Sequence, residues 1–95
     1  MTKADLISEI TEKTGVEKIA VHATVESLMT SIIDAMESGE NVYLRGFGSF
    51  VIKKRAEKTG RDISKNTTII IPEHFVPTFK QAKTFVEGVK NKIKK

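Results

Sequence analysis

The residues best suited to chemistry in this 95-residue chain are cations concentrated in one segment, residues 53–65. Six lysines and arginines stand there against two acids: Lys53, Lys54, Arg55, Lys58, Arg61 and Lys65, with Glu57 and Asp62. Ammonium and guanidinium groups in series bind phosphates through charge-assisted hydrogen bonds. Charges that only keep a strand edge from aggregating are expected to be of mixed sign on a short strand. One sign dominates a long segment here, which favours binding to a polyanion.

Other kinds of site find little support in the sequence. The chain has no cysteine, and its two histidines, His22 and His74, lie far apart without a partner at metal-ligand spacing. The segment Gly46-Phe47-Gly48 lacks the third glycine and the following helix of a dinucleotide-binding loop. We therefore expect no metal, no cofactor and no catalytic activity.

The net charge of +4 conceals a strong asymmetry. Residues 1–40 have three lysines and eight acids, a net charge of −5, whereas residues 41–95 have thirteen lysines and arginines and four acids, a net charge of +9. A basic part on an ordinary scaffold is typical of a nucleic-acid-binding surface. No uninterrupted apolar run approaches the roughly 18 residues of a membrane span, and no signal-peptide segment opens the chain. We expect a cytoplasmic protein that does not enter a membrane.

Helical periodicity predicts three helices, over 3–14, 18–38 and 81–93. Thr2 and Asp5 fit a capping box at the start of the first helix, and Gly15 fits its end. The apolar face of the second helix is broader than one short partner helix would cover. We therefore expect a second subunit, most simply in a twofold homodimer.

Between the helices the pattern changes to β structure. One strand is expected over 42–45, and a second begins at Ser49 and continues to Arg61. After a reversal near 62–66, residues 67–71 form the return strand. This ribbon has no core of its own, and ten of its residues extend about 30 Å. We expect it to project from the body of the protein.

Ile63 is a large apolar residue at the expected tip of this ribbon. Packing within the tip is one explanation. The other is a wedge, because proteins that bend DNA from the minor groove insert such side chains between base pairs.

With these residues in place, the whole chain resembles the HU/IHF family of bacterial nucleoid DNA-bending proteins. The resemblance is carried by Lys83 and four segments: TKADLI (2–7), RGFGSF (45–50), RAEKTGR (55–61) and VPTFK (76–80).

The resemblance implies an α+β fold in an intertwined dimer, with a helical body, a three-stranded β-saddle in each subunit and a long β-ribbon arm. Residues 1–95 would form one DNA-binding domain, with dimerisation helices over about 1–40, saddle and arm over about 41–79, and a last helix over about 81–93. It also implies that Phe47, Phe50 and Phe79 pack in the dimer core. Together with the charge pattern, it assigns DNA binding to Lys3, Arg45, Lys53, Arg55, Lys58, Arg61, Lys65, Lys80 and Lys83.

Three positions depart from the family pattern. The family tip reads Arg-Asn-Pro, so Ile63 replaces an intercalating proline and Asp62 places a negative charge near the phosphates. Ala82 stands where a glycine commonly precedes Lys83. An arginine at position 45 is more similar to the beta subunit of IHF than to many HU proteins, so the subfamily stays open. The choice between a homodimer and a heterodimer with a paralogue also stays open.

The sequence thus predicts a non-enzymatic architectural protein of the bacterial cytoplasm and nucleoid. It would bind double-stranded DNA through phosphates and the minor groove, with little base specificity, and bend and compact it. The alternative is an RNA-binding or ribosome-associated basic protein, because A-form helices are also recognised by shape and charge. A third possibility is a structural partner whose arms bind protein.

Overall fold

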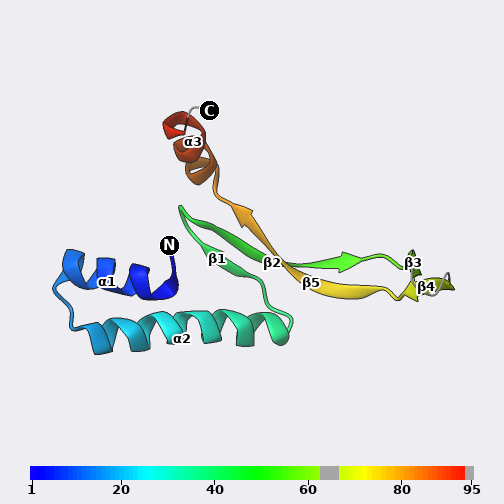
Figure 1. The fold of residues 1–95 in the computed structure, drawn as a ribbon, viewed down its shortest axis with the longest axis horizontal. Coiled ribbons are helices and arrows are strands. Elements are labelled where there is room, and N and C mark those ends of the chain that lie inside the picture. Colours follow the sequence, from blue (N-terminus) through cyan, green and yellow to red (C-terminus); the bar gives the residue numbers. More distant parts are fainter. Residues whose placement is uncertain (63–66, 94–95) are drawn as a thin grey trace. The chain divides into compact units, whose positions relative to one another are not determined.

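A computed structural model describes residues 1–62 and 67–93 and shows an α+β chain (Figure 1). The chain forms two compact units, Met1–Ala35 and Met36–Lys95. The first unit is helical, and the second holds the described strands and the last helix.

The first helix, α1 (Lys3–Thr14), has the predicted bounds because both ends are capped. The Thr2 hydroxyl accepts a hydrogen bond from the Asp5 amide at 3.3 Å, and the Asp5 carboxylate accepts one from the Thr2 amide at 2.9 Å. This capping box satisfies amides that have no partner inside the helix. Gly15 closes the other end with a φ of 74°, a left-handed conformation that favours glycine.

The second helix, α2 (Lys18–Glu37), ends one residue before its predicted boundary. Ile7 of α1 and Val21 of α2 form the small buried core of the described residues, with 2% and 4% of their surface exposed. Most other apolar side chains of α2 are exposed, including Leu28 at 51% and Ile33 at 54%. A helix pair that covers so little apolar surface leaves a face for another molecule.

Among the described helices, α2 is long and apolar enough to cross a membrane, contrary to the expectation from uninterrupted runs. Small hydroxyl residues and acids such as Glu26 and Asp34 interrupt the runs, but the average over 18 residues stays apolar. Length and composition alone do not make a span, because core helices of water-soluble proteins meet the same criteria.

Three antiparallel strands form the main sheet, in the order β1 (Val42–Leu44), β2 (Gly48–Arg55) and β5 (His74–Gln81). The turn between β1 and β2 needs Gly46, whose φ is 82°. Gly48 is needed for space, because a Cβ there would lie 2.5 Å from the Phe79 ring and 2.6 Å from the Lys80 carbonyl oxygen. The two glycines of the corner therefore have different structural roles.

The arm is a separate two-stranded sheet of β3 (Lys58–Asp62) and β4 (Thr67–Ile71) (Figure 1). The prediction of one continuous strand from Ser49 to Arg61 is therefore wrong. Pairing stops after Arg55 and His74 and resumes at Lys58 and Ile71, so two residues on each strand leave the ladder. Pro72 is one of them, and its ring nitrogen has no hydrogen to donate to a neighbouring strand.

The last helix, α3 (Lys83–Lys92), begins two residues later than predicted because Gln81 belongs to β5. The Ala82 amide donates a hydrogen bond to the Phe47 carbonyl at 2.9 Å. Lys90 and Lys92 lie in the last turn, where positive charge is favourable beside the carbonyl end of the helix.

Candidate nucleic-acid interface

Strand register separates the side chains of the main sheet onto two faces. Successive residues alternate between faces, and directly paired residues share one. Phe50 pairs with Phe79, whereas Lys53, Arg55 and Lys80 occupy the alternate positions of the same strands. These three predicted DNA-binding residues therefore share the face opposite the phenylalanine pair, which we call the cationic face.

Four phenylalanines pack together in the second unit. The ring centroids of Phe47 and Phe79 are 5.2 Å apart, and those of Phe50 and Phe79 are 4.9 Å apart. Phe85 of α3 stacks on Phe47 at 5.5 Å. The three expected aromatic residues thus meet in one cluster, and Phe85 is a fourth member that the sequence analysis did not single out. Its position on the apolar face of the last helix was the available signal.

Lys54 differs from the cations on either side of it. It pairs with Phe75, so it lies on the other face of the sheet. Its ammonium forms an ion pair with the Glu73 carboxylate at 2.9 Å, next to the junction of sheet and arm. Lys53 and Arg55 are exposed on the cationic face and are the better placed pair for phosphates.

Arg45 and Lys83 each precede a member of the phenylalanine cluster by two residues, Phe47 and Phe85 respectively, and both are exposed. Arg45 is in the turn between β1 and β2, and Lys83 is the first residue of α3. The backbone amide of Ala82, the residue that replaces the family's glycine, donates a hydrogen bond to the Phe47 carbonyl within the same chain.

The arm places its two described cations on opposite faces. Lys58 pairs with Ile71 and Arg61 with Thr68, three positions apart along β3. A duplex groove that encloses a ribbon could meet both faces. Ile63 and Lys65 lie outside the described residues, so the expected wedge and the expected tip contact stay predictions.

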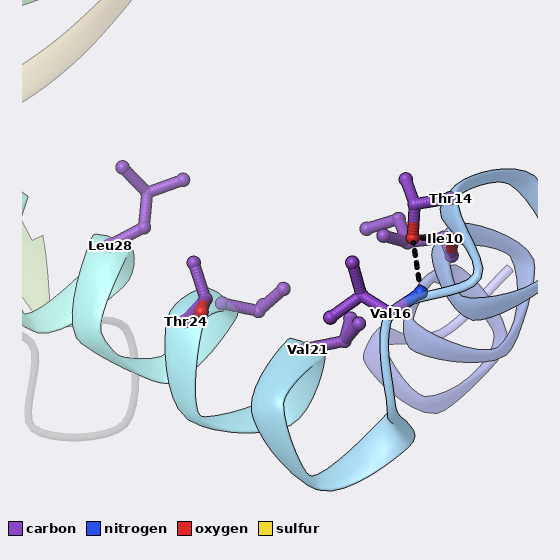
Figure 2. A pocket seen from close by; sticks show the side chains of 7 residues that line it. Ile10, Thr14, Val16, Val21, Thr24 and Leu28 are labelled. Atoms are coloured by element: carbon purple, nitrogen blue, oxygen red, sulfur yellow. Dashed lines mark hydrogen bonds between the residues drawn. The ribbon is translucent and has the colours of Figure 1, made fainter.

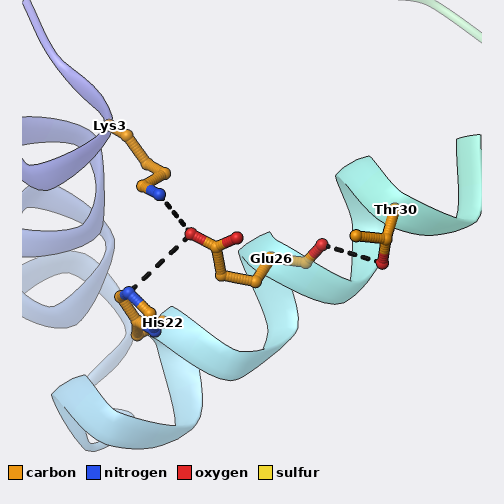
Figure 3. Close-up of polar contacts among 4 residues, drawn as sticks. All are labelled: Lys3, His22, Glu26 and Thr30. Carbon is orange, nitrogen blue, oxygen red and sulfur yellow. Dashed lines mark hydrogen bonds and ion pairs between the residues drawn. The ribbon is translucent and has the colours of Figure 1, made fainter. Parts of the chain in front are cut away.

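Lys3 forms an ion pair with Glu26 of α2, and His22 lies 3.8 Å from the same carboxylate oxygen (Figure 3). The hydrogen bond and charge of Lys3 hold the pKa of Glu26 below its usual value. A phosphate that binds Lys3 must therefore compete with Glu26. Sequence reasoning missed this pair because 23 residues separate its partners.

An apolar groove of about 350 Å³ lies in the helical unit. Figure 2 shows Val21, Thr24 and Leu28 of α2 and Ile10 of α1 along it, with Val16 between the helices. The Val16 amide donates a hydrogen bond to the Thr14 hydroxyl at 3.2 Å, which fixes the turn at one end. The groove is a surface that apolar side chains could fill.

The described residues contain no group of three histidine, aspartate or glutamate side chains that could hold a metal ion. The polar arrangement they do contain is a series of exposed cations on one sheet face, on both faces of the arm and at a helix start. Such an arrangement binds anions rather than activating a substrate.

Comparison with known proteins identifies the family of the chain. A family profile described as "Bacterial DNA-binding protein" matches residues 1–90. The chain is 39% identical over 92 residues to the SPbeta prophage-derived DNA-binding protein HU 2 of Bacillus subtilis, covering 97% of this chain and all of that protein. It is 37% identical over 95 residues to DNA-binding protein HU of Thermus thermophilus, covering 100% of this chain and 94% of that protein.

Among solved structures, an Anabaena HU–DNA cocrystal structure superposes with a TM-score of 0.90 and 37% identity, covering 94% of this chain and 97% of that chain. The chain belongs to the HU family of bacterial DNA-binding proteins. The family consists of architectural DNA-binding proteins and not of enzymes. The alternative of an RNA-binding or ribosome-associated protein finds no support in these comparisons.

Proposed function

We propose that this protein binds double-stranded DNA as a homodimer and bends it in the bacterial nucleoid, with residues 1–95 acting as one DNA-binding domain. The observation that carries the proposal is the cationic face, because Lys53, Arg55 and Lys80 lie on the same side of the sheet, opposite Phe50 and Phe79. Phosphate contacts from such a face give affinity with little base specificity, because phosphates carry no sequence information.

The dimer is supported by the apolar surface that one chain leaves exposed. Leu28 and Ile33 of α2 are more than half exposed, and Leu28 also lines the apolar groove. In the second unit, Phe47 is 47% exposed although it belongs to the phenylalanine cluster. A second copy of the chain would cover these surfaces, and we assign Phe47, Phe50 and Phe79 to its interface.

The proposed DNA contacts extend beyond the sheet. Lys58, Arg61 and Lys65 would follow the minor groove along the arm, and Ile63 would enter between base pairs at the tip. Lys3, Arg45 and Lys83 would contact flanking phosphates. Isoleucine has the bulk for a wedge but lacks the fixed φ of proline. Because phosphate contacts supply most of the affinity and the wedge supplies the kink, we expect Ile63 to affect the bend angle more than the affinity.

Competition binding tests the class of nucleic acid. Duplex DNA and duplex RNA of equal length and ionic strength should compete unequally, with DNA the stronger competitor. Equal competition, or preference for RNA, would contradict the proposal.

A second experiment tests the wedge. In a nicked duplex with a dye at each end, the distance between the dyes should decrease when the protein binds and bends the DNA. Ile63→Ala should reduce this decrease while retaining most of the affinity. The matched control is Ile70→Ala, because Ile70 is an exposed apolar residue of β4 away from the tip. Equal bending by all three proteins would leave Ile63 without a role as a wedge.

A further inference from the structure

We propose that His74 is a proton-dependent contact for a DNA phosphate at the junction of the sheet and the arm. The inference rests on the proposed function, because it requires DNA on the cationic face. It goes beyond that function because it makes the DNA affinity of the cationic face depend on pH.

His74 shares the cationic face by register. It is the first residue of β5 and pairs with Arg55 of β2, whose side chain lies on that face. Its own side chain is exposed. Any phosphate that approaches Arg55 from this side of the sheet comes within reach of the imidazole.

A hydrogen bond to the backbone sets the state of the ring. His74 Nδ1 lies 2.9 Å from the Pro72 carbonyl oxygen. A carbonyl can only accept, so Nδ1 carries the hydrogen and donates. In the neutral ring, Nε2 is then an acceptor with a lone pair, which a phosphate oxygen repels.

Protonation changes this one atom. Nδ1 is already committed to Pro72, so the added proton goes to Nε2 and turns it into a charged donor. Within the described residues, Nε2 has no other hydrogen-bond or ion-pair partner. The contact with phosphate therefore requires the protonated ring, and its strength increases as the solution is made more acidic.

The charges around His74 favour a bound phosphate as the group that completes the site. From β2, Arg55 lies opposite His74 and Lys53 lies two residues further along the same face. On its own strand side, Glu73 precedes His74, and its carboxylate is engaged with Lys54 at 2.9 Å. With the adjacent acid already paired, a phosphate is the anion that can balance two cations and a protonated imidazole.

The chain offers its own control, because His22 is the only other histidine and lies on α2 beside Glu26. The experiment measures affinity of the full chain for one DNA duplex at several salt concentrations, at pH 8 and pH 6. The proteins are wild type, His74→Ala, His74→Lys and His22→Ala.

Wild type should bind about twofold to fivefold more tightly at pH 6 for each His74, the range of an exposed ion pair. Its plot of log affinity against log salt should steepen by about 0.9 for each phosphate that His74 neutralises. His22→Ala should keep both changes, His74→Ala should lose both, and His74→Lys should show the steeper slope at both pH values.

A pH effect that persists in His74→Ala and disappears in His22→Ala would overturn the proposal and assign the effect to the Lys3–Glu26 pair. A pH effect that is absent in wild type would also overturn it. Both outcomes leave DNA binding at pH 8 intact, whereas failure of the proposed function would appear as salt-independent or absent binding at either pH.

Discussion

The three-stranded sheet and the arm carry similar cations but hold them in different ways. Lys53 and Arg55 project from β2, whose opposite face carries Phe50 packed against Phe79 further along the strand. In the arm, all five residues of β4 are exposed, so β3 and β4 are held together mainly by backbone pairing. A two-stranded ribbon is marginal by itself in water. We therefore expect the sheet to position its charges before DNA binds, and the arm to gain packing only in contact with DNA.

Truncation of a packed side chain should separate the two regions most strongly. Phe79→Ala removes the residue that contacts both Phe47 and Phe50, and should lower the free energy of unfolding by about 3 kcal/mol, the low end of the usual range because Phe79 is half-buried. Ile70→Ala in the arm should change it by less than about 0.5 kcal/mol, because that side chain is 63% exposed. Urea unfolding at one fixed protein concentration measures both. Equal losses would mean that the arm has a core of its own.

Glycine replacement offers a second contrast between the same regions. Gly48→Ala should destabilise the protein by about 1–2 kcal/mol, because the new Cβ would lie within 2.6 Å of the Phe79 ring and of a backbone carbonyl. Gly60→Ala should be tolerated within about 0.5 kcal/mol, since its nearest neighbours in the described chain, including Ile71, stand at 3.9 Å. Thermal unfolding compares the two variants, and a neutral Gly48→Ala would show that the corner can relax.

Unlike the cations of the sheet face, Lys3 already forms an ion pair within the described part of the protein, with Glu26. Glu26→Gln removes its competitor and should strengthen DNA binding about twofold to threefold at low salt. Glu9→Gln is the matched control, because Glu9 pairs at 3.3 Å with Lys13, which has no assigned DNA contact. Unchanged affinity in Glu26→Gln would show that Glu26 does not compete for Lys3, and an equal gain in Glu9→Gln would show that net charge alone matters.

Acid should act on the helical unit through two carboxylates. The amide and hydroxyl of Thr2 lower the pKa of Asp5, and Lys3 lowers that of Glu26. Groups with a lowered pKa stabilise the fold above their unfolded value of about 4, and this contribution is lost as pH falls through the folded value. The double variant Asp5→Asn and Glu26→Gln should therefore lose less helical circular dichroism below pH 4 than wild type. Identical acid profiles would show that neither bond matters.

The sequence predicted best what local chemistry determines. The bounds of α1 follow from Thr2, Asp5 and Gly15, and no distant residue is needed to place them. The break in the arm was missed because Pro72 acts on a strand that is distant in sequence, and the residues before Lys58 look suitable for a strand by themselves.

The candidate site shows the same division. Because side chains alternate between the two faces of a strand, Lys53 and Arg55 lie on one face of the sheet and Lys54 on the other, and this follows once the strand is recognised. The partners of Lys3 and Lys54 were not predictable, because each ion pair joins residues that are distant in sequence and that only the fold brings together.

The central claim is that the cationic face of the sheet, rather than net positive charge, binds DNA phosphates. The most direct test is the salt dependence of DNA affinity for wild type, the double variant Lys53→Ala and Arg55→Ala, and the double variant Lys54→Ala and Lys90→Ala, which removes equal charge from other positions. The first double variant should lower the magnitude of the log–log slope by about 0.9 for each lost phosphate contact, and the second should leave it close to wild type. Equal reductions in the two double variants would contradict the account.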